Sequence, residues 1–164
     1  MRATTYDSDG LPKSASASSS TPSSEGATAY RTGDISLTTT PTAITFDLEV
    51  KDTGGIHSTS SNTSRMVAPS TGTYILAING GYYYHGSGGS CEIKVYKNGS
   101  AVTGYYHGVY SNVQYVPGPC GLWLIDLTAN DYVEVFVYVN SGTGTWYSSG
   151  SNVGGYIAVT LVRV

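Results

Sequence analysis

The chain has 164 residues, a formal net charge of −3 and only 12% charged residues, against about 25% in an average protein. This length suits one domain with its own hydrophobic core. The acidic balance argues against a nucleic-acid partner held by phosphate contacts. No stretch approaches the roughly 18 consecutive apolar residues of a membrane helix, so we expect no membrane partner.

Residues 1–28 differ in composition from the rest of the chain, with eight Ser, two Pro and no Val, Ile, Phe or Trp. Such a segment cannot bury a core and is expected to be disordered by itself. We predict an extended arm that becomes ordered across a neighbouring surface, and the alternative is an arm folded back on its own domain. The residues predicted to attach it are Tyr6, Leu11, Pro12 and Pro22. Because no apolar run follows Met1, we expect synthesis without a secretory signal, in the host cytoplasm.

Residues 29–164 are predicted to form the domain. Its apolar segments alternate or run for five to eight residues and break at Gly, Asn, Ser or Pro, which is typical of an all-β sandwich. Lys97-Asn98-Gly99-Ser100 predicts a tight hairpin, Ala129-Asn130-Asp131 predicts a second turn, and Gly-rich loops are expected at 86–89 and 141–145. The ten expected strands are 30–37, 42–50, 55–58, 64–68, 72–79, 90–97, 101–110, 121–127, 132–139 and 155–163.

Several of these strands carry apolar residues on both faces. In 132–139 the valines form one face, and the opposite face is unusually aromatic. In 122–127 and 156–164 both faces are apolar. Because a two-layer sandwich has one inner face per sheet, the extra apolar faces predict a symmetric subunit interface. The predicted interface residues are Trp123, Ile125, Phe136, Tyr138 and Tyr156.

The sequence shows no constellation for catalysis or metal binding. His57, His85 and His107 have no metal-ligand spacing, and no nucleophile elbow, phosphate loop or dinucleotide fingerprint is present. Asp126 and Asp131 flank a turn, where Asp forms local hydrogen bonds, and a glycosidase pair is the weaker alternative. We therefore predict no enzyme, no metal and no cofactor. The two cysteines are predicted either as buried thiols or as one bridge between neighbouring strands.

Five short motifs in order resemble the C1q-type globular domain of the tumour-necrosis-factor-like superfamily, over roughly residues 33–164. Ile44-Thr45-Phe46-Asp47 matches an early strand, and Ala68-Pro69 with Gly72 and Tyr74 resembles its "APxxGxY" signature. Three later segments are similar to family motifs: Tyr96-Lys97-Asn98-Gly99, Leu127–Val133 with Asn130 in place of the usual Gly, and Gly155-Tyr156-Ile157. The resemblance implies a ten-stranded jelly roll packed as a homotrimer. The collagen-like stalk of the complement branch is absent from this sequence, and the acidic calcium-binding loops of some relatives are not evident.

Two functions fit these observations. The first is a bacteriophage structural protein: a trimer that decorates and cements the virion surface, with the major capsid protein as the partner of its arm. The second is the head of a tail or capsid fibre that binds a host-surface glycan, since aromatic rings in Gly- and Ser-rich tracts stack on sugars. The residues predicted for glycan contact are Tyr83, Tyr84, Trp146 and Tyr147. The short segment before the domain favours decoration, because a fibre head needs a long shaft.

Overall fold

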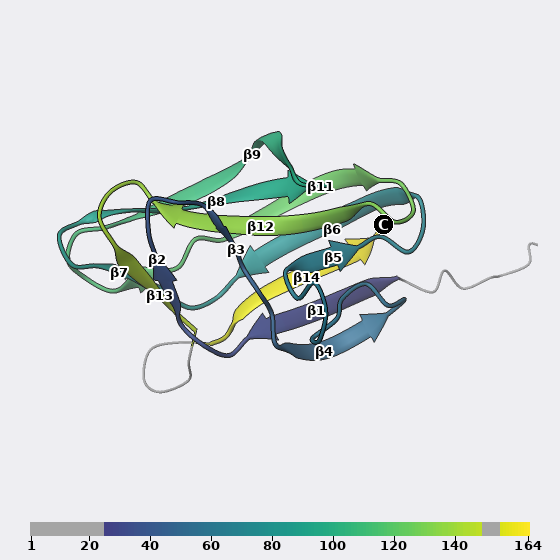
Figure 1. The fold of residues 1–164 in the computed structure, drawn as a ribbon, viewed down its shortest axis with the longest axis horizontal. Helices are drawn as coiled ribbons and strands as arrows, with labels where there is room; N and C mark the ends of the chain where they lie inside the picture. Colours follow the sequence, from purple (N-terminus) through teal and green to yellow (C-terminus); the bar gives the residue numbers. More distant parts are fainter. Residues whose placement is uncertain (1–24, 149–154) are drawn as a thin grey trace, which may run out of the picture.

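A computed structural model describes residues 25–148 and 155–164 of the chain, which contain fourteen strands and no helix (Figure 1). Ten strands were expected; the larger number reflects short segments that run beside longer strands. The strands are β1 Gly26–Arg31, β2 Ile35–Leu37, β3 Thr42–Ala43, β4 Leu48–Thr53, β5 Arg65–Val67, β6 Gly72–Asn79, β7 Tyr82–His85, β8 Gly89–Lys97, β9 Ser100–Ser111, β10 Val116–Pro117, β11 Gly121–Leu127, β12 Tyr132–Val139, β13 Gly144–Tyr147 and β14 Ile157–Arg163.

The strands form an all-β sandwich. One sheet has the order β11-β6-β14-β1-β4, a second has the order β3-β12-β8-β9 with β5 also paired to β12, and a smaller sheet has the order β10-β7-β13-β2. The core lies between these layers, where alternate residues of each strand point inward. Its largest fully buried side chains include Trp146, Tyr74, Tyr83 and Phe46.

Three strands were predicted to the residue: 72–79, 121–127 and 132–139 are β6, β11 and β12. The expected strand 30–37 is divided into β1 and β2. In addition, β1 begins at Gly26 and buries Ala27, so residues 26–28 belong to the sheet and were wrongly assigned to the arm. The expected strand 55–58 is a loop, because the carboxylate of Asp52 accepts hydrogen bonds from its backbone N–H groups.

Both predicted turns are present. Asn98 and Gly99 have φ angles of 50° and 79°, the positive values of a primed turn, and they join β8 to β9. Asn130 has a φ of 71°, and the N–H of Asp131 donates to the carbonyl of Thr128 at 2.9 Å. These turns fix the register of the strands around them.

The described chain starts and finishes at the same end of the sandwich. The N–H of Arg163 donates to the carbonyl of Glu25 at 2.9 Å. In Figure 1 the C-terminus lies at one end of the long axis, and β7 and β13 lie at the other. The predicted arm residues Tyr6, Leu11, Pro12 and Pro22 lie outside the described residues.

Candidate functional site

The outer surface of the sheet β11-β6-β14-β1-β4 carries apolar side chains from its edge strand β11 across β6 to β14. Strand register places Leu122 opposite Ala77 and Leu124 opposite Ile75, and Ile75 in turn lies opposite Val162. Leu122 is 68% exposed and Leu124 is 57% exposed, although both are leucines in the interior of a strand. We name this surface the apolar face, and its residues are Leu122, Leu124, Ile75, Ala77, Thr160, Val162, Thr28, Leu48 and Val50.

The β11 residues that were predicted for the subunit interface, Trp123 and Ile125, lie on the opposite side of the strand. Ile125 is only 5% exposed and lies in the core, so its assignment to a subunit interface is wrong. Trp123 also points inward, where it packs against the core and stacks with Tyr105 at 6.2 Å between ring centroids. Both faces of β11 are apolar, so alternation alone could not tell which face is buried. Leu122 and Leu124 were therefore missed.

The other predicted interface residues are divided between two surfaces. Phe136 and Tyr138 lie on the outer face of the second sheet, where Phe136 contacts Tyr96 at 4.1 Å between ring centroids. Lys94 Nζ lies 4.9 Å from the ring centre of Tyr138. Tyr156, exposed just before β14, contacts Tyr30 of β1 near the apolar face. The five predicted interface residues therefore do not lie together on one face of the protomer.

A second feature is a cleft on the outer side of the small sheet. Its volume is about 440 Å³, and its lining residues are Tyr84, Gly86, Ser87, Gly142, Thr143, Gly144, Thr145 and Tyr147. We name it the tyrosine cleft. It is formed by Tyr84 of β7, three residues of β13 and the loops that adjoin them. Figure 1 shows β7 and β13 at the end of the sandwich opposite the C-terminus.

Three tyrosines gather at this cleft. The ring of Tyr115, from the β9–β10 connection, stacks on Tyr84 with 5.1 Å between centroids. Tyr115 also lies 5.4 Å from Tyr147. A hydrogen bond between the side chains of Tyr115 and Tyr147 raises the pKa of Tyr115. The sequence missed Tyr115, because it lies far along the chain from the two aromatic tracts.

The two remaining residues predicted for glycan contact are buried. Tyr83 and Trp146 are each 0% exposed, so the prediction that they contact a glycan is wrong. Strand alternation turns them into the core while Tyr84 and Tyr147 point outward. Trp146 Nε1 donates to the carbonyl of Gly80 at 3.0 Å, and the hydroxyl of Tyr83 donates to the carbonyl of Gly89.

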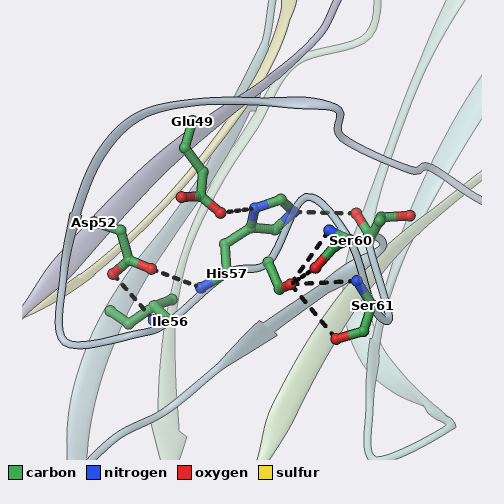
Figure 2. A network of polar contacts seen from close by, with 8 residues as sticks. Glu49, Asp52, Ile56, His57, Ser60 and Ser61 are labelled. Carbon is green, nitrogen blue, oxygen red and sulfur yellow. Dashed lines mark hydrogen bonds and ion pairs between the residues drawn. The ribbon is translucent and has the colours of Figure 1, made fainter.

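His57 is the centre of a polar network in the loop after β4 (Figure 2). Its Nδ1 lies 2.9 Å from a carboxylate oxygen of Glu49, and its Nε2 lies 3.1 Å from the carbonyl of Thr63. The hydroxyl of Ser58 accepts hydrogen bonds from the N–H groups of Ser60 and Ser61 instead of contacting the imidazole. Because both ring nitrogens face oxygen acceptors, His57 has no nucleophile to activate and serves to hold the loop in place.

The carboxylates that flank the β11–β12 turn are engaged in structural contacts. Asp131 accepts hydrogen bonds from Lys97 Nζ, Asn98 Nδ2 and the N–H of Thr128. These contacts, that of Lys97 first, hold the pKa of Asp131 well below its usual range. A general acid of a glycosidase needs the opposite shift. Asp126 accepts a hydrogen bond from the hydroxyl of Thr73 at 2.7 Å.

Both cysteines are free thiols. Cys91 is buried in β8, and burial raises its pKa, whereas Cys120 is exposed, so the bridge and the pair of buried thiols are both wrong. Residues 25–148 and 155–164 contain no group of three His, Cys, Asp or Glu that could hold a metal ion. Within the same residues there is no helix of the length and hydropathy needed to span a bilayer.

No profile of a known protein family matches the chain, and no curated protein does. Solved structures do match. The globular domain of zebrafish complement 1qA protein superposes with a TM-score of 0.56 at 12% identity, covering 86% of this chain and 96% of that one. The fold is a jelly roll of the C1q and tumour-necrosis-factor type.

Two further structures agree. Eiger TNF from S. frugiperda gives a TM-score of 0.55 at 12% identity, covering 86% of this chain and 92% of that one. Murine APRIL at pH 8.0 gives 0.57 at 12% identity, covering 86% and 99%. The fold implied by the sequence motifs is thus confirmed. Likeness at this identity extends to the fold alone, and the bacteriophage setting stays a prediction.

Proposed function

We propose that this chain is a structural protein that acts as a homotrimer, and that the protomers meet through the apolar face. The exposure of Leu122 and Leu124 carries this proposal. Transferring one leucine side chain from water to an apolar contact is worth about 1.5–3 kcal/mol. Contiguous apolar patches on monomeric proteins are small and often functional. Two leucines side by side with Ile75 and Val162 therefore favour a partner surface.

A second copy of the chain is the occupant that best fits the apolar face. The central residues of the face carry no charge, and charged residues are likewise depleted in the cores of protein interfaces. Charged groups lie at its margins, with Lys51 on β4 opposite Thr28 and Asp126 at the end of β11. Because oligomers of identical chains are normally closed and symmetric, each protomer would contribute the same sheet.

We further propose that the trimer decorates a virus shell and that residues before Glu25 attach it to the major capsid protein. The Ser-rich composition of that segment favours binding across a neighbour through backbone hydrogen bonds. The domain would then point its β7 and β13 end away from the shell, since Glu25 lies at the opposite end (Figure 1). The proposed location is the capsid surface of the virion.

The attachment is tested with shells assembled without this protein. Full-length chain and a chain lacking residues 2–23 are incubated with these shells, and bound protein is counted by electron microscopy. The deletion stops before Glu25, because its carboxylate contacts Ser70 and Tyr74 of the domain. We expect the full chain to decorate and the deleted chain to lose decoration, with little effect of moderate salt because the segment has few charges.

A third protein, in which residues 2–23 are replaced by a Gly-Ser repeat of equal length, controls for simple tethering. It should fail to bind as the deletion does. Undiminished decoration by the deleted chain would refute attachment through the arm. Absence of any binding by the full chain would refute the decoration role itself.

A further inference from the structure

The tyrosine cleft has a distinctive chemistry. Its eight lining residues are three glycines and five residues that carry hydroxyls, and none is charged. The volume of about 440 Å³ lies within the roughly 300–1,000 Å³ of small-molecule sites. The hydroxyls of Tyr84, Ser87 and Thr143 can each donate and accept hydrogen bonds. The cleft therefore suits a ligand that is neutral and rich in donors and acceptors.

The aromatic side of the cleft adds a second requirement. Tyr84 and Tyr147 line the cleft, and the ring of Tyr115 stacks on that of Tyr84 and limits its movement. A tyrosine ring offers a rigid apolar surface at a small entropy cost. The ligand must therefore combine a flat apolar side with hydroxyls around its edge. A pyranose ring has this combination, since its axial C–H groups form an apolar face and its hydroxyls lie around the rim.

We propose that the tyrosine cleft binds one or two pyranose units of an uncharged glycan. Tyr84 and Tyr147 provide the stacking surfaces, and Ser87, Thr143 and Thr145 provide hydrogen bonds to the sugar hydroxyls. An acidic sugar is disfavoured because no cationic side chain lines the cleft to offset its desolvation.

The proposal is tested on an immobilised panel of neutral glycans that end in glucose, galactose, mannose or N-acetylglucosamine, with sialylated and sulfated glycans beside them. The best neutral glycan is then titrated calorimetrically against the wild type and variants. We expect Tyr84→Ala to weaken binding at least tenfold and Tyr84→Phe, which keeps the ring, to weaken it two- to fivefold. Thr143→Lys places a long charged side chain in the cleft from an exposed position and should also cost at least tenfold.

Tyr110→Ala is the matched control, because this tyrosine is 61% exposed on β9 and does not line the cleft. It should bind as the wild type does. Thermal unfolding of each variant establishes that the domain is folded. The proposal would be overturned if the wild type bound none of the neutral glycans or preferred the acidic ones. It would also be overturned if the wild type, Tyr84→Ala and Thr143→Lys bound equally well.

Discussion

Trp146 illustrates how much one residue depends on its neighbours in space. Its ring is fully buried, and backbone of two glycines closes around it. A Cβ added at Gly118 would lie 2.2 Å from Trp146 Nε1 and 2.7 Å from the carbonyl of Gly80. The indole thus fits only because position 118 has no side chain. The sequence shows a Pro-Gly-Pro segment there but not the distant tryptophan that requires it.

We expect Gly118→Ala to destabilise the domain by about 1–3 kcal/mol, the usual cost of an overpacked core. The matched control is Gly33→Ala, because a Cβ at Gly33 meets nothing within 4 Å. The free energy of unfolding from urea titration, followed by tryptophan fluorescence, compares the two variants. Equal free energies of unfolding for the two variants would contradict this prediction and show that the side chains around Trp146 can move to accommodate a methyl group.

The elements follow the sequence where side chains alternate between a clearly apolar and a clearly polar face. β8 is such a strand, with Ile93 and Val95 buried and Glu92 and Lys94 outside. β7 and β13 were missed because flanking glycines indicated loops and their tyrosines indicated exposed binding residues. In β11, where both faces are apolar, the strand was predicted but its inner face was not. Which face of β11 is buried is determined by tertiary packing, and the sequence pattern does not contain that information.

The candidate sites, like the strands, were predicted from the sequence only in part. The aromatic tracts at 82–84 and 146–147 located the tyrosine cleft, because Tyr84 and Tyr147 line it. Their neighbours Tyr83 and Trp146 could not be excluded without knowing that both tracts form strands. Tyr115 joins the cluster only through the folded β9–β10 connection. The excess of apolar faces indicated a partner surface, but the residues that form the apolar face required the structure.

The two turns at one end of the sandwich are coupled by a single carboxylate. Asp131, from the β11–β12 turn, binds Lys97 and Asn98 of the β8–β9 hairpin. Its pKa is lowered in the folded state, so the stability it provides is complete above the unfolded pKa of about 4. This contribution is lost as the pH falls through the lower, folded-state pKa.

We therefore expect Asp131→Asn to be less stable than the wild type at pH 5 to 7, with a difference that shrinks steadily toward pH 2. Urea titrations of both proteins across this range measure it. Asp34→Asn serves as a control for general acid sensitivity, because Asp34 accepts a hydrogen bond from the N–H of Ser148 outside these turns. A difference between wild type and Asp131→Asn that does not change with pH would contradict the assigned role.

At the scale of the whole molecule, the proposed tasks belong to separate surfaces. The apolar face covers one sheet, and the tyrosine cleft is lined by residues of β7 and β13, which lie at one end of the long axis (Figure 1). Glu25 is hydrogen-bonded to Arg163, close to the C-terminus at the other end. On the protomer, the proposed trimer contact, the proposed attachment end and the cleft therefore do not share residues. The His57 network and the Asp131 contacts belong to the scaffold that keeps these surfaces in place.

The mass of the purified protein in solution tests the central claim, assembly through the apolar face. Light scattering at micromolar concentration should give three times the chain mass of 17.2 kDa for the wild type. The double variant Leu122→Glu with Leu124→Glu should give a folded monomer, since both positions are exposed in the protomer and glutamates there would be buried only in the trimer. Val113→Glu, at an apolar position in the β9–β10 connection that is 50% exposed, should remain trimeric. A monomeric wild type, or a double variant that keeps the trimer mass, would contradict the account.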